Sequence, residues 1–534
     1  MRYLNLIWMK KKKIDCIGVG RKQSRDLWVG QRIFELIKMY RVVIIGAGIT
    51  GSSIARVLSK YENLDVVLLE KEIDVGWGAT KANTGILHPG HEDDPEKYPI
   101  RAELCAEGNR LWREWSEELD IPVKWPGELM IAYNEDELET CKRYMEIGKK
   151  NGVNNLRIVD RGELKELEPM VSEEAKYALY APSAGVVEPW EAVIGVVENA
   201  VDNGVEIHLD TEVKDIIIGK GRVKAVVTDR GDIQADIVIN AAGLYADEVS
   251  SMAGVDDFEI RPRKGQYYLF DEDVKEKPEK IVHPTPTEKT KGVYAVQSVE
   301  GNLMLGPTAE DLSKMCKDER STSEEGLNFI WKHSKDLLRE LPGKDRISKT
   351  FAGLRPEPPD GKYIIKSYED VYGFVNAAGI RSPGLASAPA TANMVRDILK
   401  EDLGIDLIKK SNWNPEREGI TRFSEQGKEK KEELIQKNQN YGKVVCMCKE
   451  VTKAEILEAV ERVKRLGDEV SLDSIKFRTL ALFGFCQGSY CRAKIAEILS
   501  EELDKPMWKI DTRGKGTEYG IGYIKVLQDK GKCD

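Results

Sequence analysis

Gly46-Ala47-Gly48-Ile49-Thr50-Gly51 is the segment that most strongly indicates the fold of this chain. It follows an apolar run over 41–45 that is typical of a β-strand, and it opens a helix expected over 52–59. The first glycine permits a tight turn, the second lets backbone N–H groups approach a pyrophosphate, and the third lets the helix pack closely on the strand. The stretch therefore predicts a βαβ unit that binds a dinucleotide, with the phosphates at the positive end of the helix.

An acidic residue then selects among dinucleotides. The second strand, expected over 66–69, ends at Glu70, which comes 24 positions after Gly46. A carboxylate there accepts a hydrogen bond from the adenosine ribose 2′-OH and would repel a 2′-phosphate. At this point both FAD and NAD remain open.

Length and charge limit the class of protein. The chain has 534 residues, 41% of them hydrophobic, which predicts two or three globular domains. A net charge of -10, built from nearly equal acidic and basic content, offers no basic face to a nucleic acid. The longest apolar runs have strand length, and residues 4–13 lack the order of an export signal. We therefore expect a cytoplasmic chain without a membrane span.

Strand-and-glycine units recur near Ile237 and Tyr372, so the nucleotide-binding domain is expected to form from separated pieces of the chain. We predict an α/β oxidoreductase domain over 41–408, with Rossmann-like FAD-binding pieces at about 41–90, 181–254 and 351–408. An inserted α+β substrate domain is expected at about 91–180 and 255–350. Residues 1–40 are expected to be an extension that arises from a misassigned start near Met39, with a genuine flexible extension as the alternative. The charged segment 409–442 is expected to be a linker.

Two further groups of residues resemble the FAD-dependent oxidoreductases related to D-amino-acid oxidase. The first, GWGATKANTGILHPG at 76–90, is similar to the segment that runs beside the flavin in that family. The second comprises Ile239-Asn240-Ala241-Ala242-Gly243 and Gly379-Ile380-Arg381-Ser382-Pro383-Gly384-Leu385. The resemblance covers about 41–407 and favours FAD over NAD. Besides the residues of the glycine turn, it implies FAD contacts at Thr80, Asn83, Val213, Ala242, Gly243, Gly379, Gly384 and Leu385.

The same resemblance supplies candidate substrate residues. His88 is the expected base for a hydroxyl proton, and Thr84 lies four positions before it, as a hydroxyl residue does in glycerol-3-phosphate relatives. Arg355 corresponds to an arginine that binds the substrate's anionic group. Lys264 resembles a lysine that faces substrate, and Arg381 lies in the loop over the flavin. Phosphate and carboxylate groups bind the same hydrogen-bond donors, so these residues do not decide which of the two groups the substrate carries.

Four of the nine cysteines are clustered near the C-terminus. Cys446 and Cys448 are separated from Cys486 and Cys491 by 37 residues, and two short helical patterns flank the cysteines. Four thiolates suit a [2Fe-2S] cluster, whereas structural zinc sites usually pair cysteines two to four residues apart. The spacing favours the cluster and leaves zinc as the alternative.

The sequence around these cysteines resembles the bacterioferritin-associated ferredoxin type of [2Fe-2S] domain. We expect this small helical domain over 443–505, followed by a tail over 506–534. The domain order is similar to that of the large subunit of anaerobic glycerol-3-phosphate dehydrogenases. The resemblance implies oxidation of glycerol 3-phosphate by FAD and transfer of electrons through the cluster to a second flavoprotein or iron-sulfur subunit, one that can dock at a membrane. The alternatives are a dehydrogenase of a 2-hydroxy acid or of an amino acid such as proline, and a non-catalytic electron-transfer subunit.

Overall fold

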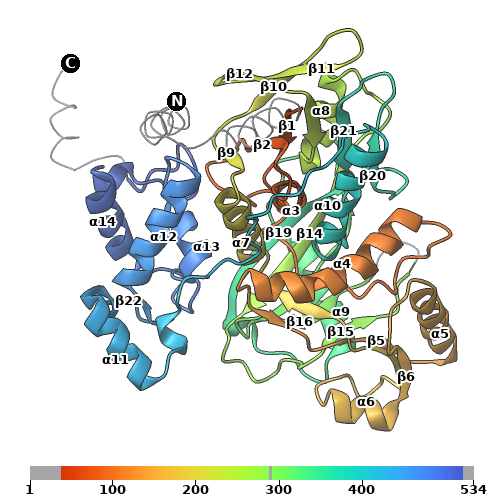
Figure 1. Cartoon of the computed structure of the whole chain (residues 1–534). Helices are drawn as coiled ribbons and strands as arrows, with labels where there is room; N and C mark the ends of the chain where they lie inside the picture. Colours follow the sequence, from red (N-terminus) through yellow and green to blue (C-terminus); the bar gives the residue numbers. More distant parts are fainter. Residues whose placement is uncertain (1–37, 288–290, 521–534) are drawn as a thin grey trace, which may run out of the picture.

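The computed structural model describes residues 38–287 and 291–520. An α/β part carries the glycine turn, a second part is built on a large, mostly antiparallel sheet, and a small helical part holds the four clustered cysteines (Figure 1). This architecture confirms the predicted fold class. The expectation for the start of the chain concerns residues that lie outside those described.

The first part is a six-stranded sheet in the order β20-β21-β13-β1-β2-β9. Its central strands are β1 (Tyr40–Ile45), β2 (Leu64–Leu69), β13 (Ile237–Asn240) and β21 (Phe374–Ala378), which run parallel to one another. β9 (Glu206–His208) is parallel to β2, and β20 (Ile364–Ser367) is antiparallel to β21. Ile45 lies opposite both Leu69 and Asn240, so the residues that follow these three strands meet at one edge of the sheet.

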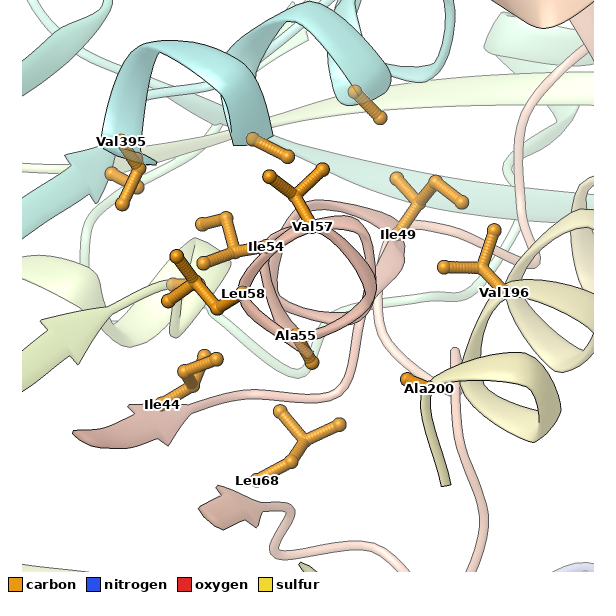
Figure 2. Close-up of a cluster of buried hydrophobic side chains, with 14 of the residues drawn as sticks. Ile44, Ile49, Ile54, Ala55, Val57, Leu58, Leu68, Val196, Ala200 and Val395 are labelled. Atoms are coloured by element: carbon orange, nitrogen blue, oxygen red, sulfur yellow. The ribbon is translucent and has the colours of Figure 1, made fainter. Parts of the chain in front are cut away.

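Helix α3 (Ile49–Leu58) is central to the packing of this part. Nine of its ten residues are buried, because the helix is enclosed by the sheet, α7 (Pro189–Asp202) and α10 (Gly384–Glu401). Figure 2 views α3 along its axis, with Ile44 and Leu68 of the sheet on one side and Val395 of α10 on the other. An apolar surface on nearly every side of a short helix fixes it firmly against its neighbours. The glycine turn is therefore held by a rigid core.

The second part is a nine-stranded sheet in the order β18-β14-β17-β16-β15-β5-β7-β6, with β19 also paired to β14. Its strands are β5 (Glu128–Ala132), β6 (Arg157–Asp160), β7 (Tyr177–Ala181), β14 (Arg261–Phe270), β15 (Ile281–Pro284), β16 (Tyr294–Gln297), β17 (Leu303–Gly306), β18 (Glu310–Asp311) and β19 (Ile347–Glu357). β19 pairs with β14 along nearly its whole length. Residues 351–357, expected in the FAD-binding part, thus belong to this sheet.

Smaller elements complete the two parts. Two three-stranded sheets are formed by β10 (Val213–Ile218), β11 (Val223–Thr228) and β12 (Gly231–Gln234), and by β3 (Ile86–Leu87), β8 (Gly185–Val187) and β4 (Val123–Lys124). The remaining helices are α4 (Pro99–Glu118), α5 (Glu135–Lys150), α6 (Arg161–Leu167), α8 (Ala246–Met252) and α9 (Glu324–Leu337).

The third part contains α12 (Lys453–Leu466), α13 (Leu472–Thr479) and α14 (Arg492–Leu503), with the short strands β22 (Val444–Cys446) and β23 (Val451–Thr452). α12 begins with a capping box, in which Thr452 and Glu455 satisfy each other's backbone N–H groups. The three helices bury one apolar core that includes Cys446 and Cys491. The cysteines therefore sit on a packed scaffold rather than on a free loop.

The segment expected to be a linker is firmly held at its start. Arg417 pairs with Glu198 of α7 at 2.6 Å, and Arg422 pairs with Glu191 at 2.5 Å and with Glu300 at 2.7 Å. Further along, the segment forms α11 (Lys428–Lys437). Its composition resembled that of a free linker because charged side chains, rather than apolar ones, make most of these contacts.

Candidate functional site

A cavity of about 950 Å³ lies where the carboxyl edge of the six-stranded sheet faces the large sheet. Ligands of open α/β sheets bind at such an edge. Both parts contribute to its walls, since the glycine turn and the 78–84 loop face β14 and β19 across it. Of the residues predicted from the sequence, those lining the cavity are Gly46, Gly48, Ile49, Thr50, Glu70, Thr80, Asn83, Thr84, His88, Ala242, Gly243, Arg355, Arg381, Gly384 and Leu385.

The glycine turn has the close contacts that the sequence predicted. Gly46 has a φ of 103°, and a Cβ there would lie 2.5 Å from the carbonyl oxygen of Ala241. A Cβ on Gly51 would lie 2.0 Å from the carbonyl oxygen of Gly46, so only glycine lets α3 start so close to the strand. The N-terminus of α3 therefore opens directly into the cavity, where a pyrophosphate fits.

Glu70 braces this turn. Its carboxylate accepts hydrogen bonds from the backbone N–H groups of Ala47, at 2.8 Å, and Glu72, at 3.0 Å, while the side chain also lines the cavity. Thr80 accepts a hydrogen bond from the N–H of Ile49 at 3.0 Å. Burial raises the pKa of Glu70. The carboxylate keeps acceptor capacity for a ribose hydroxyl while it fixes the loop.

The helix predicted after Gly384 is α10, which begins at that residue. Gly384 and Leu385 line the cavity, so the positive end of the α10 dipole faces it. Asn83, on the opposite loop, donates a hydrogen bond to the carbonyl of Thr80 at 2.6 Å and accepts one from Gly85. The 78–84 loop and the start of α10 thus both line the cavity.

Four predicted residues are not among the cavity walls in the described part of the chain: Gly51, Val213, Gly379 and Lys264. Gly51 acts through packing, and Val213 begins β10 and packs against an apolar cluster beside the first sheet. Gly379 has a φ of 64° in the turn before α10. Lys264 is buried, and its Nζ lies 3.6 Å from a carboxylate oxygen of Glu310.

Arg355 forms no close ion pair with a carboxylate among the described residues. Its Nη2 donates to the carbonyl of Thr308 at 2.5 Å, and its Nε is buried with no hydrogen-bond partner among the described residues. Its neighbours differ, because Arg263 pairs with Asp311 at 2.5 Å and Arg381 with Glu357 at 2.7 Å. Burial lowers the pKa of Arg355. A desolvated guanidinium of this kind calls for an anionic ligand.

His88 lies in a buried group of ionisable residues beside the cavity. Its Nδ1 is 3.5 Å from a carboxylate oxygen of Glu92, and Glu92 is also bound by Lys291 at 2.6 Å and by the hydroxyl of Tyr294 at 2.9 Å. Burial lowers the pKa of His88 to about 4. Burial would raise the pKa of Glu92, but the charge of Lys291 outweighs this and holds it well below its usual range. His88 is therefore neutral at pH 7 and able to accept a proton.

Two more histidines continue this group away from the cavity. His91 Nδ1 lies 3.4 Å from the buried carboxylate of Glu128, and the ring of His283 stacks on Tyr294 with centroids 4.4 Å apart. Burial lowers the pKa of His91 to about 3 and that of His283 to about 4. Burial, reinforced by Glu92, raises the pKa of Glu128 well above its usual range. The group thus holds three neutral imidazoles at neutral pH.

These histidines make stability depend on pH. In the unfolded chain His91 takes up a proton near pH 6.5, whereas in the folded chain it does so only near pH 3. The free energy of unfolding is therefore highest above pH 6.5, where His91 is neutral in both states, and it decreases as the pH falls below 6.5. Below pH 6.5 we expect the wild type to lose about 1.4 kcal/mol per pH unit more than His91→Gln. Denaturant titrations at pH 7.5 and 5.5 measure this difference in unfolding free energy between the wild type and the variant. Carboxyl groups with raised pKa values have the opposite pH effect, but they are present in both proteins, so their effect cancels. Equal losses in both proteins would contradict the prediction, and the exposed His333→Gln serves as the control.

Sequence reasoning missed several cavity residues, among them Arg263, Lys291, Tyr294 and Glu92. Arg263 could have been found, because side chains alternate along a strand and Lys264 is its neighbour on β14. Glu92 stands four positions after His88, but its role depends on Lys291, which approaches from a distant segment.

The four cysteines form two pairs. The Sγ atoms of Cys448 and Cys486 are 3.5 Å apart, and Cys446 is hydrogen-bonded to Cys491. A [2Fe-2S] cluster has two iron atoms that share four thiolates, so each iron would take two of these cysteines. The donor set fits the cluster.

Comparison with known proteins identifies the family of the chain and the type of its C-terminal domain. The family described as FAD dependent oxidoreductase matches residues 41–398, and the BFD-like [2Fe-2S] binding domain matches residues 444–501. A glycerol 3-phosphate dehydrogenase of Caloramator mitchellensis is 41% identical over 487 residues, which cover 91% of this chain and 99% of that protein.

Two further relatives differ in extent. Subunit A1 of the anaerobic glycerol-3-phosphate dehydrogenase of Haloferax volcanii is 26% identical, over 87% of this chain and 83% of that protein. The dithionite-reduced, FAD-bound L-alpha-glycerophosphate oxidase of Mycoplasma pneumoniae has a TM-score of 0.65 and 28% identity, and the match covers 71% of this chain and 98% of that one. Among the described residues, no helix is long and apolar enough to cross a membrane.

Proposed function

Because this chain belongs to the FAD dependent oxidoreductase family and carries a BFD-like [2Fe-2S] binding domain, we propose that it oxidises sn-glycerol 3-phosphate to dihydroxyacetone phosphate. It is an FAD-dependent enzyme with a [2Fe-2S] cluster as its second cofactor. The observation that carries the choice of an anionic substrate is the unpaired Arg355 in the cavity that also contains His88.

Arg355 suits the phosphate end of this substrate. Its guanidinium presents a planar fork of donors, and the neighbouring Arg263 and Arg381 have their charges balanced by Asp311 and Glu357. The net positive charge of this corner therefore belongs to Arg355. A phosphate bound there would satisfy the buried Nε and compensate the guanidinium charge. Relatives named for glycerol 3-phosphate support phosphate over carboxylate as the anion.

His88 suits the hydroxyl end. Oxidation of a secondary alcohol requires that a base remove the hydroxyl proton while hydride leaves the carbon. A neutral imidazole beside the cavity can take that proton, and Glu92, held by Lys291 and Tyr294, lies on the Nδ1 side of the ring, where it stabilises the imidazolium that forms. Thr84 and Arg381 also line the cavity and are proposed to orient the substrate.

FAD, when bound, supplies the hydride acceptor in this reaction. The residues proposed to hold it are the glycine turn with Glu70 at the adenosine end, and Thr80, Asn83, Gly384 and Leu385 at the ring end. The positive end of α10 would stabilise negative charge there without a side chain.

Electrons are proposed to leave through the cluster at Cys446, Cys448, Cys486 and Cys491 to a second flavoprotein or iron-sulfur subunit. The match with the oxidase of known structure covers 98% of that protein but only 71% of this chain. The match with the relative named as a dehydrogenase covers 91% of this chain. The additional length in this chain includes the cysteine domain, and a one-electron carrier suits a dehydrogenase that delivers electrons to a protein acceptor. Attachment to a membrane would then depend on that partner.

The test is a panel of substrates mixed with the oxidised protein under argon. Glycerol 3-phosphate is expected to bleach the flavin absorbance within the mixing experiment, while lactate, 2-hydroxyglutarate and proline leave it unchanged. Bleaching by a 2-hydroxy acid or by proline alone would replace the proposed substrate. Bleaching by no member of the panel would favour a non-catalytic electron-transfer subunit.

A further inference from the structure

One face of α7 and the loop 71–84 that follows β2 together contact the four-cysteine domain. On α7, Glu198 binds Arg417 at 2.6 Å and Arg462 of α12 at 3.0 Å, and Asp202 binds Arg465 of α12. α7 also packs on the loop, because a Cβ added to Gly76 would lie 2.5 Å from Val193. Figure 1 shows the blue helices α12 and α13 beside α7. The same helix thus touches the loop of the FAD cavity and the cysteine domain.

A buried ion pair joins that loop to α13. Arg478 donates from Nη1 to Asp74 at 2.6 Å and from Nη2 at 2.9 Å, and both side chains are at most 2% exposed. Asp74 lies between Glu70, which lines the cavity, and the 78–84 stretch, which lines it again. A two-pronged contact that is fully removed from water fixes both distance and orientation. It is not the geometry of a transient surface contact.

Aromatic rings continue the contact from α7 toward the cysteines. Trp190 of α7 stacks on Phe483 with centroids 5.0 Å apart and lies 5.6 Å from the ring of Phe477. Phe483 is three residues before Cys486, and Lys81 of the flavin loop lies over both Trp77 and Phe477. Separation of the two parts would expose these rings, each of which buries about 150–250 Å² in a typical core. Apolar area and the buried ion pair therefore oppose separation.

We propose that this contact, formed by Asp74, Arg478, Trp190, Phe477 and Phe483, is a fixed electron-transfer junction between the flavin loop and the cysteine domain. The cysteine domain stays docked while electrons cross, rather than swinging between the flavin and an outside acceptor. With both cofactors bound, each crossing would take one electron from the reduced flavin and would reduce one ferric ion of the cluster to ferrous. This inference rests on the proposed electron path but not on the identity of the substrate.

Arg478→Met and Trp190→Leu test the junction, and Arg465→Met is the matched control. Arg465 makes the same type of contact to α7 through Asp202, but both partners are largely exposed. Removal of one partner of a buried pair is expected to weaken docking by about 100-fold or more, while the exposed pair contributes little. Trp190→Leu loosens the same contact without leaving a buried charge, which covers the case in which Arg478→Met fails to fold.

Two readouts separate this inference from the proposed function. Hydrogen exchange in α7 and α13 needs no substrate, and it is expected to rise in both junction variants but not in Arg465→Met. The second readout is the rate of cluster reduction, followed by electron paramagnetic resonance in rapid mixing, with the flavin reduced by light and a deazaflavin. In both junction variants this rate is expected to fall about tenfold or more. Flavin bleaching by glycerol 3-phosphate should keep its wild-type rate.

Wild-type rates of cluster reduction in variants whose exchange has risen would overturn the fixed junction and show that a swinging domain suffices. Unchanged exchange in both junction variants would also overturn it, because the contact would then not hold the domain. If glycerol 3-phosphate fails to bleach the wild-type flavin, the proposed substrate is wrong, but the proposed junction is unaffected.

Discussion

His88→Gln is expected to slow reduction of the bound flavin by glycerol 3-phosphate about 10²–10⁴-fold. The imidazole lies beside the cavity, and its side chain is 10% exposed, so bulk water is a poor substitute for it as a base. Glutamine keeps polarity and approximate size but takes up no proton. Anaerobic stopped-flow at the flavin absorbance maximum measures the rate directly.

The flavin content of His88→Gln should equal that of the wild type, because the proposed dinucleotide contacts come from other residues. His333→Gln is the control, since this histidine is 43% exposed and pairs with Asp336 of its own helix. A His88→Gln protein that retains its flavin and reacts at the wild-type rate would remove His88 from the mechanism.

The pH profile gives a second check on the same residue. Burial lowers the pKa of His88 to about 4, so the base stays unprotonated through the range in which an ordinary imidazole titrates. kcat/KM should therefore show no loss of activity attributable to His88 as pH falls from 7 to 6. An inflection near 6.5 that disappears in His88→Gln would contradict the lowered pKa.

Arg355→Met is expected to reduce kcat/KM about 10²–10⁴-fold, mainly through KM. Each charge-assisted hydrogen bond contributes roughly 1.5–3 kcal/mol, and the guanidinium can offer two to a phosphate. The methionine fills a similar volume, so the loss reports the charge rather than a cavity. Steady-state kinetics with an artificial acceptor separate KM from kcat.

Arg355→Lys and Arg339→Met accompany this variant. Lysine retains the charge but not the fork, so it should recover part of the affinity. Arg339 is 47% exposed and pairs with Glu340, and its loss should leave KM unchanged. An Arg355→Met enzyme with wild-type KM would show that the anion binds elsewhere, with Arg263 as the next candidate.

The sequence was most informative where the backbone alone sets the geometry. The glycine turn, Glu70 and the start of α10 at Gly384 were predictable, because close approach and strand order require particular residues at particular positions. The substrate residues were harder to predict, because the register of a strand decides which of its side chains point into the cavity. Lys264 was predicted at the cavity, but β14 directs Arg263 to it, and Lys264 lies beside Glu310.

Contacts between distant segments could not be predicted. Lys291 reaches Glu92, and Arg478 reaches Asp74 across 404 positions, without any local pattern that marks the pairs. The segment 409–442 misled for the same reason, because its arginines are recognisable as anchors only when Glu191 and Glu198 of α7 are seen beside them. Charged side chains carry information about partners that composition does not.

Electrons are proposed to pass from glycerol 3-phosphate through FAD to the four-cysteine centre. The most direct test is electron paramagnetic resonance of the wild-type protein, frozen after anaerobic addition of glycerol 3-phosphate. We expect flavin bleaching together with the signal of a reduced [2Fe-2S] cluster, and two iron atoms per chain by metal analysis. A bleached flavin with no cluster signal, in a protein that contains zinc instead of iron, would contradict it.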